Sequence, residues 1–277
     1  MVRVLLVALV ALVLPLALVP AVSARALDEQ IASKALRGTV HARVVLPAGY
    51  ASSGERYPVV YFLHGLPAGP DAYDQSRWLG RTLRQLHRAA ILVEPQGARD
   101  GDSDPEYLDW GSGRDWETYV AQELPRWVDA HFRTIPTRAG RAIVGLSAGG
   151  YGASLVGFDH PGRFAVVESW SGYFHPTDPT GHRPLDRGSE AKNAQADVHL
   201  LVAADARART LPAFFGFYVG SRDTRFRAEN ARLNRELNAE RVPHAFTVYP
   251  GGHTTALWQA HAAEWLRMAL NHLAGAR

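Results

Sequence analysis

The chain has 277 residues, of which 47% are hydrophobic and 21% are charged, values typical of a globular protein with one sizeable core. The formal net charge is only +3, and the basic residues are spread along the chain instead of clustering with aromatic residues, which argues against nucleic-acid binding. The sequence contains no cysteine, which excludes disulfide bonds, thiol nucleophiles and thiolate metal sites.

The first predicted element is an export signal. A positive charge precedes an apolar run over residues 4–22, and small residues then predict cleavage after Ala24, with Ala26 as the second choice. An uncleaved membrane anchor is the alternative, because the run is nearly long enough to span a bilayer. We therefore interpret residues 1–24 as a signal peptide and residues 25–277 as a single domain that acts outside the cytoplasm.

Strand-like and helix-like stretches alternate along this domain. The run PVVYFL at 58–63 is continuously apolar, as expected for a strand buried on both faces. In chain order the patterns predict a strand at 40–46, a strand at 58–63, a helix at 76–88, a strand at 90–93, a helix at 116–132, a strand at 141–146, a helix from 147, strands at 164–169, 214–219 and 245–249, and a last helix at 255–273. This alternation predicts an α/β fold with a mostly parallel central sheet flanked by helices.

One region interrupts the alternation. Residues 172–211 are rich in Pro, Gly, His and Asp, with a helical piece at about 189–202, and they lie between two predicted core strands. The segment is interpreted as a lid or as a wall of the substrate pocket. A surface excursion without a role at the site is the alternative.

The pattern G-x-S-x-G occurs at Gly145–Gly149, with Ser147 at its centre. Such a short pattern arises by chance, but here it follows an apolar strand and opens a helix, which is the setting of the nucleophile elbow of α/β-hydrolases. The flanking glycines avoid Cβ clashes at a sharp turn, and the helix directs its positive dipole end at the reaction centre. We predict Ser147 as the nucleophile and the N–H of Ala148 as one oxyanion donor. A glycine-rich turn with a solvated serine is the alternative.

A second oxyanion donor is expected in the loop after the strand at 58–63. The chain there reads His64-Gly65-Leu66-Pro67, and the N–H of Leu66 is the candidate. The ring of His64 precedes the nucleophile in sequence, so we interpret it as a histidine that packs beneath the site.

The order serine, acid, histidine is typical of this fold and selects the remaining members. His253 follows the strand at 245–249 and a Pro-Gly-Gly turn, so it is the predicted base. Asp223 follows the strand at 214–219 and is the predicted acid, which would hold the imidazole in the correct tautomer. An N-cap of a helix at 224–237 is the alternative role of Asp223, and Glu229 is the second candidate acid.

Several aromatic residues follow predicted catalytic loops, where they could line an acyl or sugar pocket or simply pack in the core or at its rim: Trp110, Trp170, Tyr173, Phe174 and Trp258. No metal site is expected. The H-E-x-x-H pattern of zinc hydrolases does not occur in the sequence, and the acidic loop at 100–111 lacks the glycine and the glutamate of a calcium loop.

Taken together, these stretches resemble the esterase D-type branch of the α/β-hydrolases, which includes feruloyl esterases, S-formylglutathione hydrolases and secreted mycolyltransferases. The resemblance covers roughly residues 40–273, and its motifs are Tyr61-Phe62-Leu63-His64-Gly65-Leu66, Trp116-Glu117-Thr118 with Glu123-Leu124-Pro125, Gly145-Leu146-Ser147-Ala148-Gly149-Gly150, and Gly251-Gly252-His253 followed by Leu257-Trp258. It implies a triad of Ser147, Asp223 and His253, oxyanion donors at Leu66 and Ala148, and no cofactor.

Two motifs differ from those of the mycolyltransferases. Those enzymes have Asp-Gly-Leu-Arg where this chain has His64–Pro67, and Ser-Trp after the catalytic histidine where this chain has Thr254 and Thr255. These positions belong to the sugar-acceptor site of that family, so a secreted carboxylesterase acting on a small-molecule, lipid or sugar ester is favoured. An acyltransferase that passes the acyl group to a sugar or glycerol hydroxyl is the second hypothesis, and a non-catalytic binding protein on a hydrolase scaffold is the third.

Overall fold

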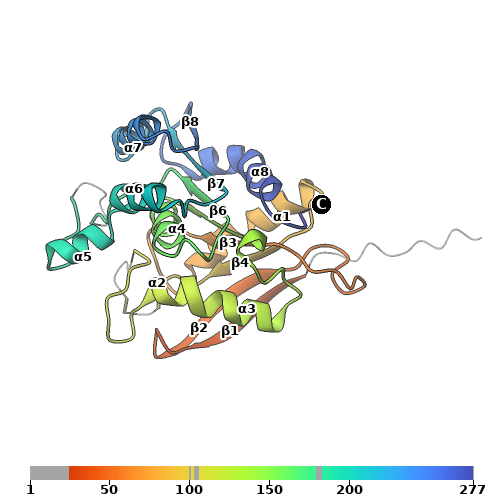
Figure 1. Ribbon diagram of the computed structural model, residues 1–277. Helices are drawn as coiled ribbons and strands as arrows, with labels where there is room; N and C mark the ends of the chain where they lie inside the picture. Colours follow the sequence, from red (N-terminus) through yellow and green to blue (C-terminus); the bar gives the residue numbers. More distant parts are fainter. Residues whose placement is uncertain (1–24, 100, 103–105, 179–182, 277) are drawn as a thin grey trace, which may run out of the picture.

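The computed structural model describes residues 25–99, 101–102, 106–178 and 183–276, so the predicted signal peptide lies outside the described residues. A sheet of eight strands crosses the domain, with helices on both of its faces (Figure 1). The strands are β1 (Ala26–Ser33), β2 (Gly38–Val45), β3 (Val59–Leu63), β4 (Ile91–Pro95), β5 (Arg141–Leu146), β6 (Val166–Trp170), β7 (Phe214–Gly220) and β8 (Ala245–Tyr249).

The strand order is β1-β2-β4-β3-β5-β6-β7-β8. β2 pairs antiparallel with both β1 and β4, and every other neighbouring pair is parallel. This is the α/β-hydrolase fold, so the predicted fold class is confirmed. Seven of the strands lie at or within two residues of their predicted positions, and β1 is an element that the sequence patterns did not indicate.

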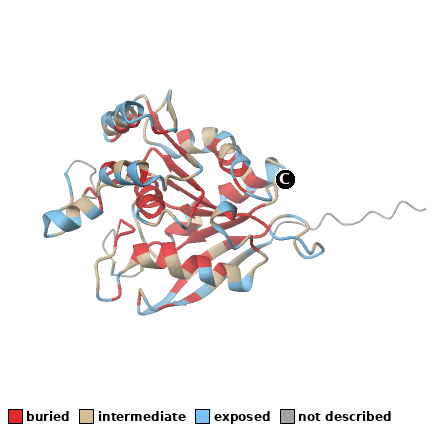
Figure 2. Cartoon of the chain, viewed as in Figure 1, coloured by how far each residue is buried: buried red, intermediate tan, exposed pale blue. Residues whose placement is uncertain are grey.

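Alternate residues of the buried strands pack into two separate cores, one on each face of the sheet. In β3, Val59, Tyr61 and Leu63 face one core, whereas Val60 and Phe62 face the other. The second core is closed by α1 and α8, and the first by the helices on the opposite face, so the central strands β3–β7 are almost entirely buried, whereas β1 and β8 at the two edges are partly exposed (Figure 2). The helices are α1 (Trp78–Gln85), α2 (Trp116–Thr118), α3 (Leu124–His131), α4 (Ala148–Asp159), α5 (Glu190–Gln195), α6 (Val198–Ala208), α7 (Arg227–Ala239) and α8 (Thr255–Asn271).

Two predicted helices differ in detail from the structure. The helix expected at 116–132 contains a π-helical turn at Tyr119–Glu123, between α2 and α3. Pro125 follows this turn, and because proline lacks an N–H and its ring displaces the carbonyl four residues earlier, the wider turn accommodates it. The helical piece expected at 189–202 is two helices, α5 and α6, because Asp197 caps a new helix by accepting the N–H of His199.

The parallel strands end at one edge of the sheet, and the loops that follow them carry the candidate site. Ser147 follows β5, residues 171–178 follow β6, Asp223 follows β7 and His253 follows β8. Carboxyl ends of parallel strands are where ligands bind in open α/β sheets. Among the described residues, no helix combines the length and the apolar character needed to cross a membrane.

Candidate active site

Ser147 lies on a strained turn between β5 and α4. Its backbone has φ 54° and ψ −122°, outside the regions that non-glycine residues normally adopt. The turn is held by the Ser147 N–H, which donates to the carbonyl of Trp170 at 2.9 Å. A Cβ at Gly149 would lie 2.0 Å from the carbonyl oxygen of Leu63, so only glycine lets the helix begin this close to β3.

The structure brings Ser147, His253 and Asp223 together in one hydrogen-bonded row. Nε2 of His253 lies 2.9 Å from Oγ of Ser147, and Nδ1 lies 2.7 Å from Oδ2 of Asp223. Ser147 is 8% exposed and Asp223 is 1% exposed. A buried acid thus orients an imidazole, which in turn contacts a nearly buried hydroxyl. This arrangement is able to activate the hydroxyl as a nucleophile.

The two carboxylate oxygens of Asp223 accept hydrogen bonds from different groups. Oδ2 faces His253, while Oδ1 accepts the N–H groups of Arg225 and Phe226 at 3.2 Å each in the turn before α7. Burial alone would raise the pKa of Asp223, but the hydrogen bonds from His253, Phe226 and Arg225 outweigh it and hold the pKa below its ordinary value. The carboxylate therefore stays charged. Its bonds to Arg225 and Phe226 hold the turn before α7, but the N-cap of that helix is Phe226, so the N-cap role considered from the sequence is wrong.

The loop after β3 lies directly against the elbow. A Cβ at Gly65 would lie 2.9 Å from Cβ of Ser147, so glycine permits the close approach that places Leu66 at the cavity. Ala148 is the first residue of α4, and the first N–H groups of a helix have no acceptor within it. Of the two candidate oxyanion donors, Leu66 therefore lines the same cavity as Ser147, and Ala148 directly follows Ser147 in the chain.

His64 fastens this loop to its neighbours. Its Nδ1 lies 2.9 Å from the carbonyl of Gly65 and its Nε2 lies 2.6 Å from the carbonyl of Gln96, while Tyr107 donates to the carbonyl of His64 at 3.0 Å. Burial lowers the pKa of His64. The ring thus packs beneath the serine loop, where the sequence analysis placed it.

A cavity of about 520 Å³ opens over Ser147 and His253, a size that suits a small organic ligand. Its lining combines apolar rings with polar groups: His64, Gly65, Leu66, Ala72, Gln75, Ser76, Trp78, Leu146, Ser147, Tyr173, Thr177, Asp178, Arg225, Phe226, His253, Thr254, Thr255 and Trp258. Three residues of the 172–211 segment, at 173, 177 and 178, stand in this wall.

The aromatic residues named from the sequence divide into two groups. Tyr173 and Trp258 line the cavity. Trp170 lies in the core on the α8 face and donates to Glu168 at 3.0 Å, and the guanidinium of Arg187 stacks over the ring of Trp110 at 5.7 Å. Neither Trp110 nor Trp170 belongs to the cavity lining.

Sequence reasoning missed Phe226, Arg225 and Trp78 as cavity residues. Phe226 and Arg225 lie just after Asp223, in the turn that leads into α7, so proximity to the predicted acid was the available signal. Trp78 begins α1 and lies both in the core and in the lining of the cavity.

Glu229, the second candidate acid, lies in a different contact network. Its carboxylate is bound by His175, by the N–H of Phe174 and by His199. Burial would raise the pKa of Glu229, but these neighbours lower it to about 2. The geometry therefore favours Asp223 over Glu229 as the partner of His253.

Comparison with known proteins identifies relatives that are similar to this chain in sequence. An esterase of Mycobacterium tuberculosis is 37% identical over 130 residues, which cover 47% of this chain and 28% of that protein. The diacylglycerol acyltransferase/mycolyltransferase Ag85C of Mycobacterium leprae is 30% identical over 128 residues, which cover 43% of this chain and 37% of that protein. The chain thus matches less than half the length of each of these two relatives.

A solved structure shares nearly the whole fold. An S-formylglutathione hydrolase from Agrobacterium tumefaciens superposes with a TM-score of 0.76 at 19% identity, covering 91% of this chain and 97% of that one. At this identity the likeness establishes the fold. A family model described as "Putative esterase" matches residues 33–267, which include β2–β8 and the three residues of the Ser147–His253–Asp223 row. The chain therefore belongs to this esterase family.

Proposed function

We propose that the protein is an exported serine carboxylesterase whose nucleophile is Ser147. The observation that carries the proposal is the row of two hydrogen bonds from Ser147 through His253 to Asp223, at 2.9 and 2.7 Å, of which Ser147 and His253 line a cavity. Membership of the esterase family supports the reaction class. Export rests on the apolar leader with a predicted cleavage site after Ala24.

Acylation begins when Oγ of Ser147 attacks the ester carbonyl and gives its proton to Nε2 of His253. Asp223 stabilises the resulting imidazolium through Nδ1. The negative charge that develops on the carbonyl oxygen is met by the N–H groups of Leu66 and Ala148, each of which contributes about 10²–10³ in rate. His253 then protonates the leaving alcohol, and the acyl group remains on Ser147.

Deacylation repeats these steps with water as the nucleophile. His253 removes a proton from water, the hydroxide attacks the acyl carbonyl, and the proton returns to Ser147 as the acid leaves. No metal or redox step is required, because the charge changes are handled by the imidazole, the carboxylate and the backbone donors.

The test is hydrolysis of p-nitrophenyl esters of increasing acyl length by the protein and by its Ser147→Ala variant. We expect turnover by the protein and a loss of about 10⁴–10⁶-fold in the variant. Ser154→Ala is a matched control, because Ser154 lies on the same helix and its hydroxyl bonds the carbonyl of Gly150 in that helix. Equal turnover by protein and Ser147→Ala, or none by either, would contradict the proposal and favour a binding protein on this scaffold.

A second function, acyl transfer to a hydroxyl acceptor, is favoured by the mycolyltransferase among the relatives. The acylation step is the same, so the acceptor decides. Glycerol or trehalose added during hydrolysis should leave the yield of free acid unchanged for an esterase. Conversion of acid into a glycerol or trehalose ester would make the protein an acyltransferase.

A further inference from the structure

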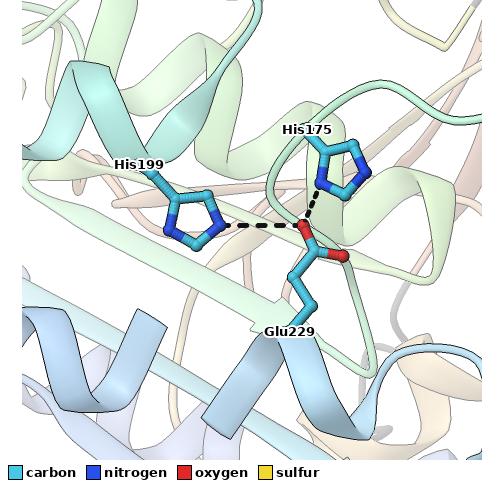
Figure 3. A group of neighbouring side chains, drawn as sticks. All are labelled: His175, His199 and Glu229. Atoms are coloured by element: carbon cyan, nitrogen blue, oxygen red, sulfur yellow. Dashed lines mark hydrogen bonds and ion pairs between the residues drawn. The ribbon is translucent and has the colours of Figure 1, made fainter. Parts of the chain in front are cut away.

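A cluster of two histidines and a glutamate lies outside the active-site cavity. Figure 3 shows His175, in the loop after β6, and His199, on α6, both pointing at Glu229 on α7. Oε1 of Glu229 lies 2.5 Å from Nδ1 of His175 and 3.7 Å from Nε2 of His199. One nitrogen or oxygen atom from each residue lies within 4.8 Å of the other two, and none of the three residues lines the cavity.

The His199 side chain is the most informative member of the cluster. It is only 6% exposed, and its Nε2 is a buried polar atom without a hydrogen-bond partner. Buried ring nitrogens are normally satisfied. Figure 3 shows this nitrogen directed at Oε1 of Glu229, 3.7 Å away, too far for a hydrogen bond. The gap between the ring and the carboxylate therefore calls for a proton on the ring or for a cation between the two groups.

A second carboxylate fixes this orientation. Nδ1 of His199 lies 2.5 Å from Oε2 of Glu236, and the other oxygen of Glu236 accepts Nε of Arg232 at 2.7 Å. The contact with Glu236 fixes the orientation of the ring, so that Nε2 faces Glu229. Histidine ligands of metals are held in this way by an outer carboxylate.

The spacing and the donor types fit one class of ion. Two histidine nitrogens and a carboxylate oxygen are a set found in three-ligand zinc sites. Two ligands about 2.1 Å from a tetrahedral ion lie about 3.4 Å apart. The 3.7 Å separation of Oε1 from His199 is close to this value, whereas the 2.5 Å contact with His175 is a hydrogen bond that would have to open on binding. The His175 side chain is 34% exposed, which leaves an entry path and room for a water molecule as fourth ligand.

We propose that His175, His199 and Glu229 form a binding site for a divalent transition-metal ion of the Zn²⁺ type. The sequence analysis expected no metal, because it found neither the zinc-hydrolase pattern nor a calcium loop. It did not indicate this cluster, since the three residues are spread over 55 positions, from 175 to 229, and only the fold brings them together. The ion would join three segments: the loop that carries Tyr173 of the cavity wall, helix α6 of the 172–211 segment, and helix α7, which follows Asp223. The site is structural, because it holds a wall of the cavity and does not touch the reacting atoms.

A second group of possible ligands exists among the described residues, made of Glu117, Asp159 and His160. Nε2 of His160 lies 3.3 Å from Glu117 and 4.0 Å from Asp159, and the Asp159 side chain is 41% exposed. It has one histidine, and no outer carboxylate holds that ring from the other side among the interactions of the described residues. This second group therefore serves as a control for the proposed site within the same protein.

The experiment is a titration of chelator-treated protein with ZnCl₂ at neutral pH, followed by calorimetry and by thermal unfolding. We expect one ion to bind per chain. When free zinc reaches about 100 times its dissociation constant, Tm should rise by about 5–10 °C. MgCl₂ should have no effect, because Mg²⁺ prefers oxygen ligands in octahedral geometry.

Two ligand variants and two controls assign the site. His175→Ala alters a partly exposed side chain, and Glu229→Gln keeps the shape of a buried one, so both are expected to fold. Each should lose the zinc-dependent rise in Tm. His160→Ala removes the histidine of the comparison group, and His41→Ala removes an exposed histidine 3.3 Å from Asp28. Both controls should keep the rise.

Retention of one bound ion and of the Tm rise in His175→Ala and Glu229→Gln would overturn the proposal, as would loss of both in His160→Ala. Absence of zinc binding by the chelator-treated protein would overturn it too, and would leave the cluster as a network of histidines protonated against two glutamates. These readouts are independent of ester hydrolysis, so they stand whether or not Ser147 proves to be the nucleophile.

Discussion

The ring of Phe226 lies edge-on against the imidazole of His253, with ring centroids 5.2 Å apart and an angle of 63° between the planes. Trp258 contacts the same imidazole at 5.1 Å and 89°. Phe226 follows Asp223 by three residues and donates its backbone N–H to that carboxylate. One short turn therefore supplies both the acid that orients the imidazole and one of the two rings that confine it.

Phe226→Ala should lower kcat for p-nitrophenyl acetate by about 10–100-fold, because an imidazole displaced by about 1 Å loses much of its alignment with Ser147. Phe226 is 3% exposed, so its truncation should also lower the free energy of unfolding by about 3–5 kcal/mol. The kinetics should therefore be measured at a temperature well below the Tm of the variant. Phe226→Leu keeps most of the bulk and should lose less activity. A truncated variant with the kcat of the wild type would show that the ring does not position His253.

Asp223→Asn should lower kcat by about 10⁴-fold at an unchanged fold, because an amide in this place favours the wrong tautomer of His253. The amide oxygen is still able to accept the N–H groups of Arg225 and Phe226, so the start of α7 is kept. Steady-state kinetics and circular dichroism of the purified variant check both statements. A loss of less than tenfold would mean that another group orients the imidazole.

Gly149→Ala should destabilise the protein by at least about 3 kcal/mol, because the new Cβ would lie 2.0 Å from the carbonyl oxygen of Leu63 and backbone on both sides would have to move. Gly162→Ala is the matched control, since no atom lies within 4 Å of a Cβ at that exposed position, and it should change stability by no more than about 0.5 kcal/mol. Urea unfolding of both variants measures the difference. Equal stability of the two variants would contradict the packing argument.

The free energy of unfolding should depend on pH through the ionisation of Glu94. Its buried carboxylate lies 3.0 Å from Arg43, yet burial dominates over this ion pair and raises the pKa of Glu94 from 4.5 to about 7. Between these two values the unfolded chain releases the proton more readily than the folded protein does, so the free energy of unfolding falls as pH rises. Relative to Glu94→Gln, the wild type should lose about 3 kcal/mol between pH 4.5 and 7.

Denaturant unfolding of both proteins at several pH values tests this directly. The wild type should be the more stable of the two on the acid side of the interval and should lose that advantage on the basic side. A difference that stays constant, or that grows with pH, would mean that Arg43 keeps the carboxylate charged in the folded protein.

The sequence predicted the parts of the fold in which hydrophobic pattern and burial coincide. The strand at 141–146 matches β5, which is almost wholly buried, at both ends. The strand at 245–249 also matches β8 at both ends, although β8 is only partly buried. β1 was missed because its side chains alternate between exposed and partly buried positions and include Asp28 and Glu29, so it has no apolar run. Only its antiparallel pairing with β2 makes it a strand.

The candidate site was predictable where chain order and local motifs determine position. Ser147, Asp223 and His253 each follow a strand in the expected order, and the structure places them within hydrogen-bonding distance of one another. The position of Trp170 could not be predicted in this way. It ends a strand buried on both faces, and such a strand has no polar alternation to tell which face a given side chain takes. Trp170 points to the core closed by α8 instead of the cavity.

If the proposed mechanism holds, the divided use of the Asp223 carboxylate couples activity to a local folding equilibrium. Proteins open in small cooperative units at a lower free energy than complete unfolding requires. When the turn at 223–226 opens, Oδ1 loses its two backbone donors, and the acid, the confining ring and the imidazole lose their common anchor in one event. The protein should therefore pass through inactive molecules whose sheet is intact, and amide exchange in this turn should report the inactive fraction before any global melting is seen.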